Sequence, residues 1–232
     1  MAASPHPKKD LPQPAPRPVP GRRVRAGRVE RNAEQSKSRI LEAALEIFAA
    51  GGFGGARVDE IALKAGVSKN LIYHYFGNKE SLYVAVLEKS LNALAEYHDS
   101  LPVHFDDPEE AMRQIIRNTF DYFVATPKII SLMNTENLLR AKYIKSSDLI
   151  RSIYKPIMER FHRIVEFGSQ KSVFRSDIDE VDLYISISAL SYFYLSNQWT
   201  LSHIFKRNLG DAPFLAQRKE HIVAMVMSYL KP

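Results

Sequence analysis

The chain has 232 residues, of which 45% are hydrophobic and 25% charged, and its formal net charge is +6. This length accommodates a small and a larger domain with a real core, while the absence of cysteine excludes disulfide bonds and thiolate metal sites. No segment approaches the roughly 18 uninterrupted apolar residues of a membrane span, and the basic N-terminus lacks the apolar run of a signal peptide, so we expect a cytoplasmic protein.

The excess positive charge lies in the N-terminal segment. The first 39 residues carry ten Lys or Arg and three acidic side chains, so that residues 40–232 together have a net charge of −1. Seven prolines lie between Pro5 and Pro20, and an arginine-rich stretch follows them. Because proline disfavours helices and the segment has few apolar residues to bury, we expect residues 1–31 to form a disordered, extended tail.

Residues 58–76 contain two short amphipathic segments joined at a glycine. Apolar residues of the first recur at the i, i+3, i+4, i+7 spacing of one helix face: Val58, Ile61, Ala62 and Ala65. Gly66 can adopt the left-handed conformation that ends a helix, and Ser68 offers an N-cap hydroxyl to the next one. The inner face of that second helix carries Ile72, Tyr75 and Phe76. This pattern predicts a helix-turn-helix, which places its second helix in the DNA major groove.

The outward face of the second helix carries side chains suited to contacting double-stranded DNA. With Ile72 inward, Asn70, Tyr73 and His74 fall on the opposite side, and Lys69 and Leu71 lie at its flanks. Asn can bond an adenine edge, Lys a guanine or a phosphate, Tyr and His phosphate oxygens, and Leu a thymine methyl group. The alternative interpretation is a solvated polar face on an ordinary helical hairpin.

Further residues around this motif stand at fixed spacings. They are Phe48, Gly51, Gly52, Phe53, Ile61, Ala62, Gly66, Val67, Ser68, Tyr73, Tyr75, Phe76, Lys79, Glu80 and Leu82. With them, the run from Ile40 to Leu87 resembles the N-terminal domain of the TetR family of bacterial transcription regulators. The resemblance implies that Lys69, Tyr73 and His74 contact DNA and that Lys79 reaches a phosphate from the start of a fourth helix.

Two places depart from the pattern of that family. Many members have Thr or Ser just before the first helix of the motif, where this chain has Ala56 and Arg57, and Arg57 could replace the hydroxyl's phosphate contact with a charged one. Many also have a small or hydroxylated pair where this chain has Asn70 and Leu71. The operator sequence therefore cannot be taken from a relative. Our candidate DNA-contacting residues are Arg57, Ser68, Lys69, Asn70, Leu71, Tyr73, His74 and Lys79.

The proline- and arginine-rich tail allows two interpretations. It is either a passive solubilising leader or an arm whose arginines enter the minor groove or neutralise phosphates beside the second helix of the motif.

Long apolar-periodic segments without strand-like alternation fill the rest of the chain. They predict helices at about 79–101, 108–125, 128–140, 147–169, 179–204 and 213–230. Together with three helices of the motif region, they predict an all-α chain of about nine helices, with a helix-turn-helix domain at 32–78 and a larger ligand-binding and dimerisation domain at 79–232. Gly168 is expected to close one helix, and Pro156 to kink that helix or mark its start.

The last two predicted helices are apolar nearly all round, so they must be covered on several sides. In the TetR family, two C-terminal helices pair with their symmetry mates, and a single recognition helix contacts too few base pairs for useful specificity. We therefore expect a homodimer on a pseudo-palindromic operator. The alternative is that these are two core helices of a monomer.

The resemblance also implies a small organic effector, which binds between the motif and the dimer helices and releases the DNA. Our candidate effector contacts are aromatic side chains and polar groups at helical spacing: Arg117, Phe120, Phe123, Asn137, Tyr143, His162, Tyr192 and Trp199. The Arg or His would favour an anion such as an aromatic acid. Each aromatic taken singly is also compatible with plain core, and the Arg with a solvated face.

No pattern of catalytic, metal-binding or cofactor-binding residues stands out. No histidine pair has the i, i+4 spacing with a glutamate of a helical zinc hydrolase, and the glycines at 51–55 follow no strand as a phosphate loop would. The closest metal-like group, around His98 and His104, spans a predicted helix end and a loop. We therefore expect a ligand-responsive repressor and no enzyme; an activator and a non-responsive architectural DNA-binding protein are the alternatives.

Overall fold

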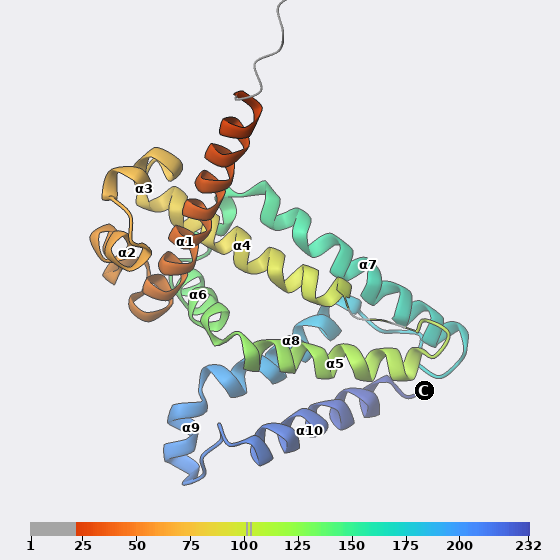
Figure 1. Ribbon diagram of the computed structural model, residues 1–232. Helices are drawn as coiled ribbons and strands as arrows, with labels where there is room; N and C mark the ends of the chain where they lie inside the picture. The colour runs from red at the N-terminus through yellow and green to blue at the C-terminus, as the bar shows by residue number, and fades with distance from the viewer. Residues whose placement is uncertain (1–21, 101, 103) are drawn as a thin grey trace, which may run out of the picture. The chain divides into compact units, whose positions relative to one another are not determined.

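The computed structural model describes residues 22–100, 102 and 104–232, and over these residues the regular structure is entirely helical (Figure 1). The elements are α1 (Arg22–Gly55), α2 (Val58–Ala65), α3 (Lys69–Phe76), α4 (Lys79–Ser100), α5 (Pro108–Ala125), α6 (Pro127–Leu138), the short 3-10 helix η1 (Ile144–Ser146), α7 (Asp148–Gln170), α8 (Glu180–Ser196), α9 (Gln198–Phe205) and α10 (Ala212–Leu230). The predicted all-α class is confirmed. None of the described helices combines the length and the apolar content that a membrane span requires.

The first helix begins earlier than the sequence analysis expects. Residues 22–31 are helical, so the expectation of an extended tail up to Arg31 is wrong for them. The reason is that Pro20 is the last proline before Pro102, and the following Arg, Val, Ala and Glu residues have no backbone feature that prevents a helix. Residues 1–21 of the expected tail lie outside the described residues.

The turn between α2 and α3 has the predicted geometry. Gly66 is left-handed, with φ 63° and ψ 41°, and the carbonyls of Ala62 and Leu63 accept hydrogen bonds from the backbone at this cap. The hydroxyl oxygen of Ser68 accepts a hydrogen bond from the backbone N–H of Leu71, at 3.2 Å. Both ends of the turn are therefore fixed by the residues that the sequence singled out.

Apolar side chains from α1 to α4 bury one another beneath this turn. Ile40 and Phe48 of α1, Ile61 of α2, Ile72 of α3 and Leu82 of α4 are almost completely buried. Because Ile72 is only 1% exposed, α3 is held with a defined face toward solvent.

Helix α5 is the central element of the larger helical part. It contacts α4, α6, α7, α8 and α10, and α4 also packs along α7 (Figure 1). Its buried residues include Met112, Ile116 and Phe120. An amphipathic helix with neighbours on this many sides needs a wide apolar face, which its sequence supplies.

Two predicted helix boundaries differ in the structure. The segment 179–204, expected as one helix, is divided into α8 and α9 at Asn197, whose side chain donates to the carbonyl oxygen of Phe193 at 2.9 Å. Such a local side-chain bond competes with helix continuation, and the division accounts for ten α-helices in the described residues instead of about nine.

Gly168 does not close α7, which continues to Gln170. A Cβ at Gly168 would lie 1.9 Å from Cδ2 of Phe174, so this glycine allows the Phe174 ring to pack closely against α7. Pro156 lies within α7 and does not mark its start.

Candidate nucleic-acid interface

Helix α3 exposes to solvent the face that is predicted to contact DNA. Lys69, Asn70, Tyr73 and His74 are exposed, and Leu71 is half-buried at the flank. Because Ile72 is buried, these side chains project from a helix that cannot rotate freely about its axis. A short helix with exposed amide, phenol, imidazole and ammonium groups has the donors and acceptors that base edges and phosphates require.

Lys69 of α3 forms an ion pair with Asp59 of α2. Its Nζ lies 2.9 Å from Oδ1 and 3.0 Å from Oδ2 of Asp59. The hydrogen bond to this carboxylate raises the pKa of Lys69. A phosphate must therefore compete with Asp59 for the ammonium group. This pair could not be predicted from the sequence, because nothing in the spacing of α2 and α3 shows which residues face each other across the turn.

Arg57 stands immediately before α2 and is exposed. Its side chain makes no capping hydrogen bond, while the backbone N–H groups of Glu60 and Ile61 bond to its carbonyl oxygen. Ala56 is buried. The helix thus begins without a hydroxyl cap, as the departure from the family pattern predicts, and the guanidinium group projects beside the motif.

Lys79 is the first residue of α4 and is partly buried. Its Nζ lies 4.6 Å from the centroid of the Phe53 ring, a cation–π contact. The neighbouring Asn78 caps α4, since its Oδ1 accepts a hydrogen bond from the backbone N–H of Ser81 at 2.7 Å. The ring contact positions the ammonium group, which retains N–H donors for a phosphate.

Arg39 of α1 stabilises the turn between α2 and α3, and this contact was not predicted from the sequence either. Its guanidinium donates to the carbonyl oxygens of Ala65 and Gly66, the second at 3.3 Å. The hydrogen-bond partner of an arginine 26 residues away along the chain cannot be read from local periodicity.

The structure does not bring the eight candidate effector contacts together. Trp199 is 77% exposed, and Asn137 is exposed as well. Phe120 is buried in the core, and Tyr143 is buried against Phe53 at a ring distance of 4.5 Å. Trp199, Asn137 and Phe120 lie on α9, α6 and α5, and Tyr143 lies in the turn before η1.

The two charged candidates already have partners. Arg117 donates to both carboxylate oxygens of Glu220, at 2.9 and 3.0 Å, and this hydrogen bonding raises its pKa. His162 is exposed, and its Nδ1 lies 2.7 Å from Glu180, which raises the imidazole pKa. An anionic ligand at either place would have to displace a carboxylate.

The remaining aromatic pair is in mutual contact. Phe123 and Tyr192 have ring centroids 6.0 Å apart, and the Tyr192 hydroxyl donates to Oδ1 of Asn134 at 2.6 Å. The two rings therefore pack α5 against α8.

His98, from the candidate metal-like group, lies against a small cavity of about 20 Å³ between α4, α5, α7 and α8. Burial and, to a smaller extent, the positive charge of the neighbouring Arg160 lower the pKa of His98 to about 4. The Arg160 guanidinium donates to the carbonyl oxygen of His98. Over the part of the chain that the structure describes, no three metal-ligating side chains gather at one point.

Comparison with known proteins matches two parts of the chain to one family. Residues 40–86 match the bacterial regulatory proteins of the tetR family, and residues 108–226 match the tetracyclin repressor-like C-terminal domain. The chain is 34% identical over 179 residues to the HTH-type transcriptional repressor NicS of Pseudomonas putida, covering 77% of this chain and 84% of that protein. It is 28% identical to the HTH-type transcriptional regulator RutR of Escherichia coli, covering 89% and 95% of the two chains.

A solved structure supports the same assignment. The crystal structure of the transcriptional regulator SCO4942 from Streptomyces coelicolor superimposes with a TM-score of 0.64 at 26% sequence identity. The match covers 85% of this chain and 99% of that one, so the similarity includes both the helix-turn-helix and the larger helical part.

Proposed function

Because the chain belongs to the tetR family of bacterial regulatory proteins, we propose that it is a homodimeric transcriptional repressor, released from a pseudo-palindromic operator by a small organic molecule. The observation that carries the proposal is the exposed polar face of α3, held outward by the buried Ile72. The proposed unit of DNA binding is residues 32–78, and residues 79–232 bind the effector and dimerise in the cytoplasm.

The proposed DNA contacts divide by chemistry. Asn70 faces the base edges, with Leu71 at the flank of this surface. The remaining contacts are with phosphates and come from Arg57, Ser68, Lys69, Tyr73, His74 and Lys79. Phosphate contacts fix the register of the protein on the duplex, while the base contacts of α3 supply the sequence preference.

Exposed apolar side chains on α8, α9 and α10 support the homodimer. Helices α8 and α10 contact each other, and together with α9 they expose Val181, Ile185, Phe193, Trp199, Met225 and Tyr229. Large apolar residues gathered on adjoining helices are typical of a surface that a partner covers. A second copy of the chain would also supply the second recognition helix that a two-fold operator requires.

Sedimentation of a charged variant tests the dimer. Phe193→Asp on α8 should shift the protein to a monomer at micromolar concentration, because an unpaired carboxylate would have to be buried. Leu149→Asp, at a residue exposed on α7, is the matched control and should remain dimeric. A wild-type protein that is monomeric at this concentration would contradict the proposal.

Selection from random DNA tests the repressor. The purified protein should enrich one two-fold symmetric sequence and prefer it over random DNA by about 10³ or more. Small metabolites are then screened for loss of binding to the enriched fragment. An architectural protein would enrich no motif, and an activator would raise transcription from a promoter that carries the enriched fragment.

A further inference from the structure

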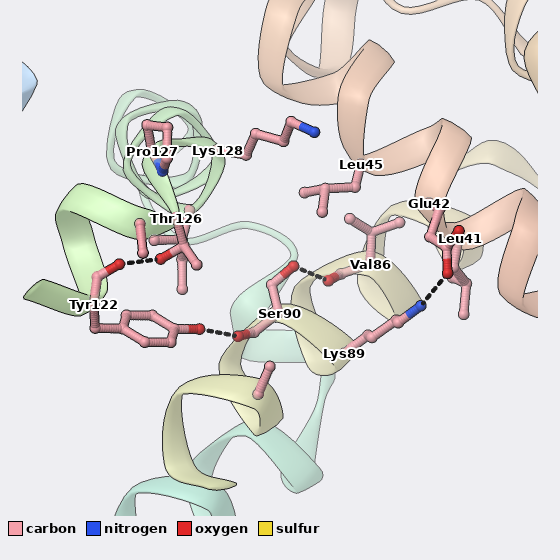
Figure 2. A pocket seen from close by; sticks show the side chains of 13 residues that line it. Leu41, Glu42, Leu45, Val86, Lys89, Ser90, Tyr122, Thr126, Pro127 and Lys128 are labelled. Carbon is pink, nitrogen blue, oxygen red and sulfur yellow. Dashed lines mark hydrogen bonds and ion pairs between the residues drawn. The ribbon is translucent and has the colours of Figure 1, made fainter. Parts of the chain in front are cut away.

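A cavity of about 330 Å³ lies where α1, α4, α5 and α6 meet (Figure 2). It is lined by Leu41, Glu42, Leu45, Val86, Lys89, Ser90, Ala93, Tyr122, Ala125, Thr126, Pro127, Lys128 and Ile129. This volume is in the range of small-molecule sites. We call it the α1–α6 cavity; it contains none of the eight candidate effector contacts.

The hydroxyl groups in the lining already donate hydrogen bonds to backbone carbonyl oxygens. Ser90 donates to the carbonyl oxygen of Val86 at 2.7 Å, and Thr126 donates to that of Tyr122 at 2.6 Å (Figure 2). The Tyr122 hydroxyl points toward Ser90 and donates to its carbonyl oxygen at 3.4 Å (Figure 2). A molecule in the cavity would therefore meet mostly carbon atoms and hydroxyl groups whose protons are already donated.

The charged side chains at the rim are likewise paired with side chains of opposite charge. Lys89 of α4 lies 3.6 Å from Glu42 of α1, and Lys128 of α6 lies 3.2 Å from Glu46 of α1. A charged ligand would have to displace a carboxylate or an ammonium group from its partner. An uncharged apolar molecule avoids that cost and gains the transfer of its surface out of water.

Ion pairs at the rim also connect α6, through α1, to α2 of the helix-turn-helix. Glu46 pairs with Lys128 of α6 and, at 2.5 Å, with Lys64 of α2. A displacement of α6 away from α1 would therefore disturb the position of α2, on which α3 packs.

We propose that the α1–α6 cavity binds uncharged, mostly apolar small molecules and that occupancy lowers affinity for the operator by separating α1 from α6. The second half rests on the proposed function, and the first half stands without it. The ligand acts by binding more tightly to the arrangement in which α1 and α6 are further apart.

Two fluorescent probes test the binding half with the full-length protein. Neutral N-phenylnaphthylamine should bind with a rise in fluorescence, and the anion anilinonaphthalene sulfonate should bind at least about tenfold more weakly, because the rim offers no uncompensated positive charge. Ala93 of α4 and Ala125 of α5 belong to the cavity lining and are themselves exposed. Ala93→Phe and Ala125→Phe should each obstruct the cavity and weaken binding of the neutral probe by about tenfold or more.

Asn92→Phe is the matched control, since Asn92 is exposed on the same helix and lies outside the cavity lining. It should bind the neutral probe as the wild type does, and circular dichroism checks that all three variants are folded. Equal binding by the wild type and both filled variants would place the probe elsewhere and overturn the site. Absence of binding to the wild type would overturn it as well.

Titration of the operator fragment tests the regulatory half. Saturating neutral probe should weaken operator binding by the wild type by about fivefold or more, and should leave the affinity of Ala93→Phe unchanged. Probe binding that leaves wild-type affinity for the operator unchanged would overturn the coupling. If random DNA yields no enriched sequence, the proposed repressor function fails while the fluorescence result still decides the cavity.

Discussion

Replacing Gly66 by Ala should destabilise the helix-turn-helix through two separable effects. The residue is left-handed, with φ 63°, and a side chain with a Cβ costs about 1–2 kcal/mol there. The new Cβ would also lie 2.6 Å from Nη2 of Arg39, which must move and give up its hydrogen bonds to the turn. Because those bonds are partly exposed, we count about 1 kcal/mol for them, below the range of about 1.5–3 kcal/mol for hydrogen bonds to charged groups. The expected total is about 2–3 kcal/mol.

Urea unfolding at one fixed protomer concentration measures this loss, since the stability of a dimer depends on concentration. Gly54→Ala is the matched control, because Gly54 does not have a positive φ and a Cβ there would meet no atom within 4 Å. Its unfolding free energy should change by less than about 1 kcal/mol. In an Arg39→Ala background, Gly66→Ala should cost only the backbone part, about 1–2 kcal/mol. An equal cost with and without Arg39 would refute the role of that side chain, and a cost as small as that of Gly54→Ala would refute the backbone argument.

Four other changes have defined outcomes. Asp59→Asn removes the ion pair with Lys69, so operator affinity measured by fluorescence anisotropy should increase by up to about fivefold at low salt. A decrease would contradict the competition between Asp59 and a DNA phosphate for Lys69. Burial lowers the pKa of His98 to about 4 in the folded protein, whereas an unfolded histidine has a pKa of about 6.5. Between these pH values only the unfolded chain is protonated at His98, so the free energy of unfolding should fall by about 2–3 kcal/mol as pH drops from about 6.5 to about 4. In urea unfolding across that pH range, His98→Gln should lose this part of the pH dependence. Gly168→Ala forces a Cβ against Phe174 and should lower Tm by several degrees in a calorimetric scan. Deleting residues 2–30 should reduce the salt dependence of operator binding if the arm contacts phosphates, and an unchanged slope would leave the arm without a role.

Local signals predicted the helix-turn-helix well. Gly66 and Ser68 act within three or four residues of themselves, through a left-handed cap and a side-chain hydrogen bond, so their effects can be read along the chain. The inward position of Ile72 follows from the same helical spacing. Fold class and the outward face of α3 could therefore be derived from the sequence alone.

Contacts between helices could not be predicted in this way. Periodicity assigned Trp199 to an apolar helix face, and Tyr143 was a candidate effector contact between two predicted helices. Neither signal indicated that Trp199 faces solvent and that Tyr143 lies against Phe53. Glu136 is a stronger case, since it is only 1% exposed and accepts hydrogen bonds from the backbone N–H groups of Tyr143 and Ile144. A buried carboxylate that holds the 3-10 helix η1 leaves no signal in the sequence around it. The α1–α6 cavity is formed by four helices and was missed for the same reason.

The electrostatics of the DNA-contacting surface of α3 favour control through the proposed dimer. Residues 40–232 have a net charge of −1, and Lys69 is already paired with Asp59, so one helix-turn-helix has little nonspecific attraction for DNA. Two copies held at the spacing of two half-sites gain an effective concentration that a single copy lacks, and this gain disappears when the spacing no longer fits. A ligand therefore needs to change only the position of the helix-turn-helix relative to α5 and α6, without touching α3. The ion pairs of Glu46 with Lys64 and Lys128 lie at the boundary where such a change would be transmitted.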